Sequence, residues 1–142
     1  YPATAHPEVT TALVAACEEL GYDYHCGVTC STDSFYAGQG RPGFGGFEAA
    51  EADGLVEELQ NAGVLNFEME AAALLTIANI YGLRAGVVCT VYANRVTGAF
   101  RTAGARRAGE VASTAAAILA AMDRAKTEAD ADHWHAGLTL DR

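Results

Sequence analysis

Lysine is almost missing from this sequence of 142 residues: Lys126 is the only one, and 9 basic residues face 18 acidic ones, for a formal net charge of −9. A surface of that sign repels phosphate backbones and anionic lipid headgroups. The composition therefore argues against a nucleic-acid or membrane partner. An excess of acidic residues with so little lysine is also typical of proteins adapted to high salt, so we expect a halophilic protein.

The sequence also has no apolar run near the roughly 20 residues that cross a bilayer, and its first residues lack the basic and apolar regions of a secretory signal. We therefore expect a cytoplasmic protein. Four cysteines, Cys17, Cys26, Cys30 and Cys89, form no regular framework and lie in apolar surroundings, which predicts reduced thiols in the core. The chain begins at Tyr1 without an initiating methionine, and we expect it to be a piece of a longer protein.

Hydrophobic residues make up 51% of the chain, enough for one domain with a core over 1–128, followed by a polar tail over 129–142. Helical periodicity predicts helices over 6–20, 55–62, 70–81 and 104–126, and the almost wholly apolar helix 70–81 should be buried on several sides. Extended patterns predict strands over 24–29, 64–67 and 84–93, the last resembling a central parallel strand. The glycine-rich stretch 32–46 and the stretch 94–103 are predicted loops. Helices that alternate with short strands indicate an α/β fold with a parallel or mixed sheet.

Open α/β sheets bind ligands at the carboxyl ends of their strands, which directs attention to residues 33–41, 66–70 and 92–95. In the second segment Glu68, Met69 and Glu70 stand between a strand and a helix. One interpretation is that these carboxylates favour the first turn of a helix, where they complement its dipole. The other is a sugar site, because a carboxylate accepts two hydrogen bonds from a vicinal diol and a methionine offers an apolar floor to the ring.

The first segment carries an aromatic ring, an amide and a guanidinium, in Phe35, Gln39 and Arg41. Such residues on a glycine-rich loop often serve only as surface anchors. They also match a flat heterocycle that has carbonyls and an N–H on its edge. Both interpretations stay open on the residues alone.

No metal or redox site is predicted. Cys26 and Cys30 share one face of the predicted strand but lack the CxxC spacing and a second pair of ligands, so core thiols are the better interpretation. His133 and His135 lie in the polar tail, where we expect them to be solvated.

Residues 66–95, NFEMEAAALLTIANIYGLRAGVVCTVYANR, resemble the nucleoside phosphorylases of the hexameric type, and most closely the uridine phosphorylases among them. Residues 27–41, GVTCSTDSFYAGQGR, are similar to the uracil-recognition segment of that family, and the resemblance extends over residues 1 to about 122. It implies the second half of a three-layer α/β/α nucleoside phosphorylase domain with a mixed central sheet. It also implies assembly into dimers and then hexamers.

The resemblance implies a role for each matching position. Phe35 would stack near the base or ribose, and Gln39 and Arg41 would hydrogen-bond the uracil edge. The ribose would be held by Glu68, Met69 and Glu70, with Glu70 on its hydroxyls. Further residues would line the nucleoside pocket: Phe67, where these enzymes commonly have tyrosine; Tyr92 and Ala93, where they have aliphatic residues; and Asn94 and Arg95, which match the uridine-type ending of the segment.

The implied activity is phosphorolysis, a glycosyl transfer of pyrimidine salvage in which uridine and phosphate give uracil and ribose 1-phosphate. Glu70, Arg41 and Gln39 would be its catalytic residues in this chain. Phosphate is a co-substrate, and no cofactor or metal is expected. In this family the phosphate ligands come from the first half of the protein, with an arginine and a histidine from across a dimer interface, so we expect a partner that supplies that half.

Two alternatives remain beside this one. A purine nucleoside phosphorylase or a nucleosidase of the same superfamily is disfavoured by Gln39 with Arg41 and by Asn94, where purine-cleaving relatives carry aspartate. A non-catalytic fragment or subunit that completes a partner is the other alternative, since the chain lacks the first half of the family's fold.

Overall fold

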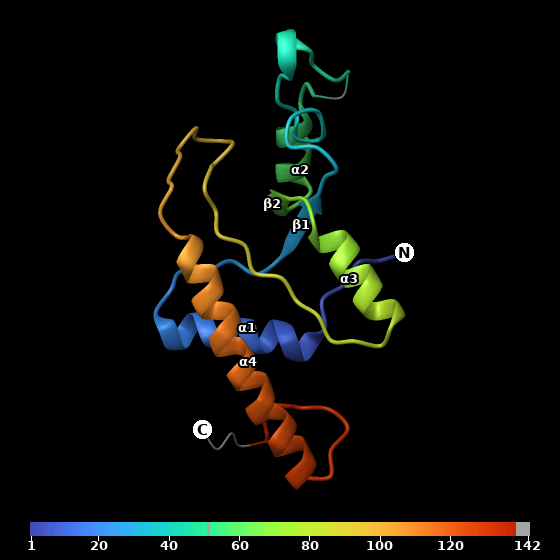
Figure 1. Cartoon of the computed structure of the whole chain (residues 1–142), viewed down its shortest axis with the longest axis vertical. Coiled ribbons are helices and arrows are strands. Elements are labelled where there is room, and N and C mark those ends of the chain that lie inside the picture. Colours follow the sequence, from blue (N-terminus) through green and yellow to red (C-terminus); the bar gives the residue numbers. More distant parts are fainter. Residues whose placement is uncertain (51, 139–142) are drawn as a thin grey trace.

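A computed structural model of the chain describes residues 1–50 and 52–138. Helices alternate with short strands, as predicted for an α/β protein (Figure 1). The elements are α1 (Pro7–Leu20), β1 (Val28–Ser31), α2 (Leu55–Asn61), β2 (Val64–Glu68), α3 (Ala71–Ile80) and α4 (Ala105–Glu128), with two short 3₁₀ turns at Ala37–Gln39 and Phe44–Gly46. The crossed helices α1 and α4 occupy one part of the molecule, and the sheet with α2 and the glycine-rich loop occupies another (Figure 1).

The predicted first helix is confirmed, and its ends have clear causes. His6 caps α1 by accepting a hydrogen bond from the Glu8 amide on Nδ1 (3.3 Å), and Pro7 takes the first helical position. Gly21 ends the helix in the left-handed region at φ 65°, where its amide reaches the last carbonyls. The predicted helix thus loses only its first residue, which serves as the cap.

The core lies where α1 crosses α4. Small residues let the two helices approach closely, and Met122 is fully buried between them. The buried residues of this cluster are Ala12, Ala16, Cys17, Val111, Ala115, Ile118 and Met122. The other predicted helices, 55–62 and 104–126, are also confirmed, with boundaries that move by one or two residues.

The two strands are parallel neighbours, with Ser31 opposite Glu68. The predicted strand 64–67 is confirmed and gains Glu68. The predicted strand 24–29 is wrong in position, because the strand runs from Val28 to Ser31. The alternation of apolar and polar residues indicates that the chain is extended here, but it does not indicate which strand pairs with it. The hydrogen bonds to β2 decide where the strand begins and ends.

The prediction of a strand over 84–93 is wrong. Within the described residues this stretch has no strand beside it. Its backbone accepts single hydrogen bonds from His6 to Ala85 (2.8 Å) and from Arg101 to Tyr92 (2.7 Å), and Ala93 forms an isolated antiparallel bridge with Phe100. A continuous apolar run indicates burial, and a strand needs in addition a neighbour that accepts and donates its backbone hydrogen bonds. The apolar pattern alone could not supply that neighbour.

Burial of the third predicted helix on several sides is also wrong. The helix itself is confirmed as α3, but Leu74, Ile77 and Ile80 are each more than half exposed. Ala71, Leu75 and Ala78 form its one buried side. Among the described residues α3 packs lightly, chiefly against β1, so most of its apolar surface has no covering element.

The cysteines are all free, as predicted, but only Cys17 belongs to the core. Cys26 and Cys89 are exposed and Cys30 is partly buried. Cys26 precedes β1, so it does not share a strand face with Cys30, and the prediction of four core thiols is wrong for three of them. In the part of the chain that the structure describes, no helix has the length and apolar character needed to span a membrane.

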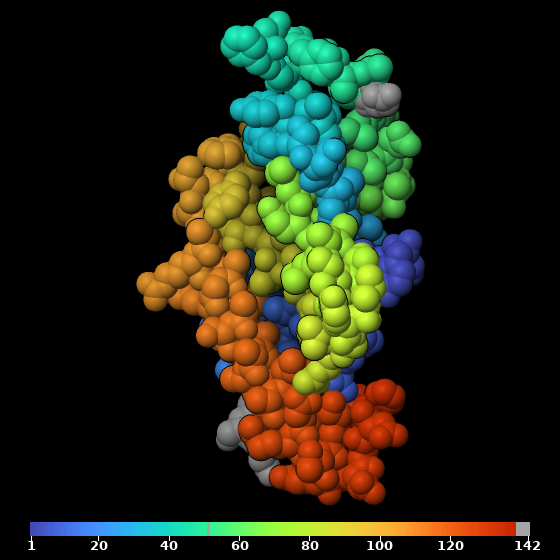
Figure 2. Space-filling model, turned by 45° about the vertical axis from the view of Figure 1, so that its right-hand side comes forward, coloured from blue at the N-terminus to red at the C-terminus, as the bar shows by residue number. Residues whose placement is uncertain are grey.

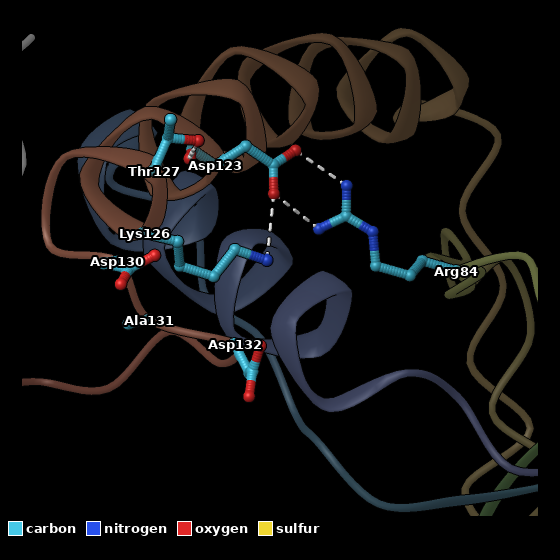
Figure 3. Close-up of a pocket in the computed structure, with 7 residues that line it drawn as sticks. All are labelled: Arg84, Asp123, Lys126, Thr127, Asp130, Ala131 and Asp132. Carbon is cyan, nitrogen blue, oxygen red and sulfur yellow. Dashed lines mark hydrogen bonds and ion pairs between the residues drawn. The ribbon is translucent and has the colours of Figure 1, made fainter.

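An ion-pair network ties α1 to α4 and to the segment after it. The buried carboxylate of Glu8 accepts hydrogen bonds from Lys126 Nζ (2.8 Å), Arg84 Nη1 (2.8 Å) and the Trp134 amide (2.9 Å). Arg84 also forms a bidentate pair with Asp123 (Figure 3). Burial acts to raise the pKa of Glu8, but the hydrogen bonds from Lys126, Trp134 and Arg84 outweigh it and lower that pKa from 4.5 to about 2.

We expect Glu8→Gln to reduce stability and to flatten its dependence on acid pH. A depressed carboxyl pKa adds stability above the ordinary value, 4.5, and this stability is lost as pH falls toward 2. Removing one partner of a buried ion pair lowers the free energy of unfolding by about 3 to 5 kcal/mol. Lys126 and Arg84 both remain paired with Asp123 in the variant, so we expect a smaller loss of about 2 kcal/mol. Urea unfolding at pH 7 and pH 3 measures both effects, with the exposed Glu57→Gln as control. Equal losses in Glu8→Gln at the two pH values would contradict the assignment.

Candidate functional site

The carboxyl ends of β1 and β2 meet at one edge of the sheet. Because the strands are parallel, Ser31 and Glu68 end side by side, and the Thr32 amide donates to the Glu68 carbonyl (2.9 Å). The glycine-rich loop leaves the sheet after β1, and α3 begins just after β2. Two of the three predicted segments, 33–41 and 66–70, therefore meet at this edge of the sheet.

Glu68 acts as the cap of α3. Its Oε2 accepts from the amides of Glu70 (2.8 Å) and Ala71 (2.5 Å), and its Oε1 accepts from the Ser31 hydroxyl. Burial acts to raise the pKa of Glu68, but the hydrogen bonds from Ser31, Ala71 and Glu70 prevail and lower it. Both oxygens of this carboxylate are engaged, so the helix-opening interpretation fits Glu68.

Glu70 and Met69 are placed differently. Both residues are exposed, and Glu70 Oε2 has one weak contact, with the Met69 amide at 3.3 Å. The structure gives its other oxygen no hydrogen bond within the described residues, and the Glu70 side chain does not cap the helix. Of the two carboxylates, Glu70 is the one free to accept hydrogen bonds from a ligand.

The three predicted residues of the glycine-rich loop form one cluster. Gln39 is buried and donates from Nε2 to Thr32 Oγ1 (3.3 Å). Arg41 lies over the half-exposed ring of Phe35, with its guanidinium carbon 4.6 Å from the ring centre. The Nε of Arg41 is buried and has no hydrogen-bond partner among the described residues. A buried donor of this kind needs an acceptor, which an ordered water or a bound ligand would supply.

Arg95 brings the third predicted segment to this cluster. Its Nη1 donates to the Gln39 carbonyl (2.7 Å) and its Nη2 to the Gly40 carbonyl (3.2 Å). Its guanidinium carbon also lies 6.0 Å from the ring centre of Phe67, at the limit of a cation–π contact. In Figure 2 the cyan surface of the residues in the thirties adjoins the lime start of α3 and lies beside the gold surface of the nineties.

Tyr92, Ala93 and Asn94 lead into the turn at residues 95–97 and do not join the cluster. The backbone of Tyr92 and Ala93 pairs with residues 100–101 on the far side of the turn. Asn94 Oδ1 accepts from the amides two and three residues further on (3.0 and 2.9 Å). In the described part of the chain no hydrogen bond joins these three residues to the glycine-rich loop or to Glu70, which leaves their predicted role in the pocket untested.

Ser31 and Thr32 contribute to the site and were not predicted. The Ser31 hydroxyl links Glu68 to the amide of Ala72 (2.8 Å), so it joins the end of β1 to the start of α3. Thr32 accepts from Gln39. They lie at the carboxyl end of β1, Ser31 as its last residue and Thr32 just after it, and this position was missed because the predicted strand ended at Thr29.

The sequence profile of the Phosphorylase superfamily matches residues 1–134. The chain belongs to this superfamily. The match covers both strand ends, the two loops that meet at Arg95, and Trp134, which packs against the core.

The chain is also similar to nucleoside phosphorylases from several organisms. The chain is 57% identical to a uridine phosphorylase of Thermococcus kodakarensis over 138 residues, which are 97% of this chain and 50% of that protein. It is 48% identical to a uridine phosphorylase of Escherichia coli over 96 residues, 67% of this chain and 38% of that protein. A guanosine phosphorylase of Halorubrum lacusprofundi is 37% identical over 98 residues, 69% of this chain and 35% of that protein. The chain therefore spans half or less of the length of these relatives.

This superfamily member also has an open pocket away from the sheet edge, lined by Arg84, Asp123, Lys126, Thr127, Asp130, Ala131 and Asp132 (Figure 3). Both of its cations are paired with acidic side chains, and it holds no aromatic residue. It therefore lacks an aromatic face on which a base could stack. In residues 1–50 and 52–138 no three His, Cys, Asp or Glu side chains are grouped so that they could hold a metal ion.

Proposed function

We propose that this chain forms the nucleoside-binding half of an enzyme that cleaves uridine with phosphate to give uracil and ribose 1-phosphate. The observation that carries the proposal is the cluster of Phe35, Gln39 and Arg41 at the same sheet edge as the exposed carboxylate of Glu70. The ring of Phe35, the amide of Gln39 and the guanidinium of Arg41 would contact a base. The carboxylate of Glu70 would accept hydrogen bonds from the hydroxyls of a sugar. The names of the relatives from Thermococcus kodakarensis and Escherichia coli support uridine as the substrate.

In the proposed reaction a phosphate oxygen forms a bond to C1′ while the bond from C1′ to N1 of uracil breaks. The electron pair of the broken bond passes to the base, which becomes anionic and takes a proton from solvent. Donors that are already in place for this developing charge lower the barrier more than they tighten ground-state binding. Arg41, with its buried and unpaired Nε, and Gln39 are the donors that this chain provides.

The sugar develops positive charge in the same step. A carboxylate that accepts from ribose hydroxyls makes charge-assisted hydrogen bonds, which strengthen as the ring becomes cationic. We assign this role to Glu70. Glu68 holds the start of α3, so it sets the direction of the backbone at Met69 and Glu70. Phe67 and Met69 would provide apolar contact to the nucleoside, and Tyr92, Ala93 and Asn94 would line the far side of its pocket.

We further propose that phosphate ligands come from the half of the fold that this chain does not span. No cofactor takes part, because phosphate itself is the nucleophile. Together the two halves would form a three-layer α/β/α domain with a mixed central sheet, and these domains would form dimers and then a hexamer. The resemblance over residues 27–41 and 66–95 supports this assembly, and sedimentation of the complete enzyme tests it.

The last part of the proposal concerns the cellular location of the enzyme and the salt concentration in which it works. We propose a cytoplasmic protein that works in high salt, supported by the formal charge of −9 and by the single lysine. Surface carboxylates in such proteins are stabilised by cations, which screen their mutual repulsion. Melting curves in increasing NaCl test the adaptation, and a melting temperature that falls as salt is added would remove it.

The role of Glu70 predicts coupled losses in the complete enzyme, that is, this chain together with the half it does not span. Glu70→Gln keeps the shape and removes the charge. A lost charge-assisted bond is worth about 1.5 to 3 kcal/mol, so kcat for uridine should fall about 10- to 100-fold, more than KM rises. Replacing uridine with 2′-deoxyuridine removes a donor from the same contact. The variant should therefore discriminate less between the two nucleosides.

Glu57→Gln is the matched control, because Glu57 is an exposed carboxylate in the first turn of α2. It should lose only the small stabilisation of a helix dipole and keep the wild-type preference for uridine. Circular dichroism checks the fold of both variants. Strictly additive losses from Glu70→Gln and from removal of the 2′-hydroxyl would reject the ribose role of Glu70.

A further inference from the structure

Arg95 reaches from the turn after Asn94 to the backbone of the glycine-rich loop. Its two terminal nitrogens donate to the carbonyls of two successive residues, Gln39 and Gly40. A planar guanidinium with two parallel donors fixes both the distance and the orientation of the groups that it binds. With both terminal nitrogens used on backbone carbonyls, Arg95 is placed to hold the loop instead of reading the base.

Among the described residues, Arg95 is the one residue outside the glycine-rich loop whose side chain hydrogen-bonds the backbone of residues 36–41. The internal hydrogen bonds of this segment are local, from the Gly40 amide to Ala37 (3.2 Å) and from the Arg41 amide to Tyr36 (2.9 Å). Gly40 sits in the left-handed region at φ 59°, and a β-carbon there would lie 3.1 Å from the Ala52 carbonyl oxygen. The backbone at Gly40 is thus closely backed on one side and held by Arg95 through its carbonyl.

Arg95 lies in a partly buried place near a second positive charge, so its two hydrogen bonds to backbone carbonyls contribute more to holding it there. Burial and the nearby Arg41 guanidinium both lower the pKa of Arg95. Two guanidinium groups of like charge repel each other, so neighbouring groups that carry partial negative charge favour their arrangement. The carbonyls of Gln39 and Gly40 offset the repulsion, because their oxygens carry partial negative charge.

We propose that Arg95 is a positioning residue, which fixes the backbone of Gln39 and Gly40 and thereby aims the side chains of Gln39 and Arg41 at the base. This inference rests on the proposed function. It assigns Arg95 an indirect role, in place of the direct contact with the nucleoside that the resemblance implies. A displacement of about 1 Å in a positioning group costs up to 10²-fold in rate, so a tether of this kind has a measurable effect.

The first test measures the loop without any substrate. Hydrogen exchange of the peptide covering residues 36–43 is compared in the complete enzyme for the wild type, Arg95→Met, Arg95→Lys and Arg101→Met. Arg101 is the matched control, since it is an exposed arginine on the same turn with no side-chain partner in the described chain. Exchange should speed up about tenfold in Arg95→Met, less in Arg95→Lys, and remain unchanged in Arg101→Met.

The second test is a double-mutant cycle on uridine cleavage. Arg95→Met alone should lower kcat/KM about 30-fold, through misplaced donors. In an Arg41→Ala background the same change should cost less than about tenfold, because one of the two side chains that Arg95 positions, that of Arg41, is already gone while Gln39 remains. Arg95→Lys keeps the charge and part of the hydrogen bonding, so it should restore part of the activity. If Arg95→Met fails to fold, Arg95→Lys replaces it in the cycle.

The outcomes separate this inference from the proposed function. Faster exchange together with non-additive losses supports the positioning role. Unchanged exchange in Arg95→Met overturns it, and so do additive losses, which would mean that Arg95 contacts the ligand itself. If the wild-type enzyme does not cleave uridine, the proposed function fails, and the exchange measurement alone decides whether Arg95 holds the loop.

Discussion

A purified polypeptide of these 142 residues should not cleave uridine in the presence of phosphate. We propose that the groups at its sheet edge serve a base and a sugar, and we expect the phosphate ligands in the half that the chain does not span. Holding a nucleophile against the reacting carbon supplies effective concentrations of about 10⁵ M or more. Without that contribution, turnover should not exceed the background rate, even if the nucleoside binds.

Activity should return when the missing half is supplied in trans. The unmatched half of the Thermococcus kodakarensis uridine phosphorylase is a suitable complement, because the matched half of that protein is 57% identical to this chain over 138 residues, and we expect the two to dock alike. Mixing the two polypeptides and measuring uracil release with and without phosphate is the experiment. The same mixture made with Arg41→Ala is the control, which should stay nearly inactive. Robust phosphate-dependent cleavage by the 142-residue chain alone would contradict the division of the site between two halves.

Local signals were sufficient for the helices of this protein. His6, Pro7 and Gly21 mark the ends of α1, because capping and left-handed backbone depend on residues within a few positions. The same holds for the position of the glycine-rich loop. Its residues meet the end of β2 because parallel strands share one carboxyl edge, which the predicted element order already implied.

Strands were harder to predict, since a strand exists through its neighbour. Residues 84–93 have the apolar composition of a central strand, yet the described chain provides no partner strand for them. The exposed side of α3 has the same cause, because Leu74 and Ile77 have no described element to pack against. The composition of a segment indicates whether it is suited to be buried. Whether it is buried depends on other segments of the fold that pack against it.

The division of roles within the site could not be read from spacing either. Glu68 and Glu70 are two residues apart and chemically alike, but Glu68 uses both oxygens on Ser31 and the start of α3, whereas Glu70 is exposed. Whether Arg95 faces a ligand or a backbone carbonyl depends on how two loops meet, 55 residues apart in sequence. Side-chain hydrogen bonds at long range decide both points.

In the complete enzyme Arg41→Ala should cut kcat/KM for uridine by roughly two to three powers of ten. The guanidinium stacks on Phe35, which keeps it in one orientation, and its buried Nε has no acceptor in the described chain. A fixed donor aimed at developing charge is worth about 2.7 to 4 kcal/mol of transition-state stabilisation. Because the charge on the base appears as the bond breaks, the loss should fall mainly on kcat.

Arg41→Lys distinguishes the charge from the geometry of the guanidinium. Lysine keeps the positive charge but not the planar fork or its stacking on Phe35, so it should recover only a small part of the lost activity. Arg101→Ala removes a positive charge from the exposed turn beside the site and should leave kcat/KM within about twofold, since screened surface charges contribute little. Steady-state rates with uridine, on variants shown by circular dichroism to be folded, provide the comparison. If Arg41→Ala were no slower than Arg101→Ala, Arg41 would be a surface anchor, and the assignment of the glycine-rich loop to base recognition would be wrong.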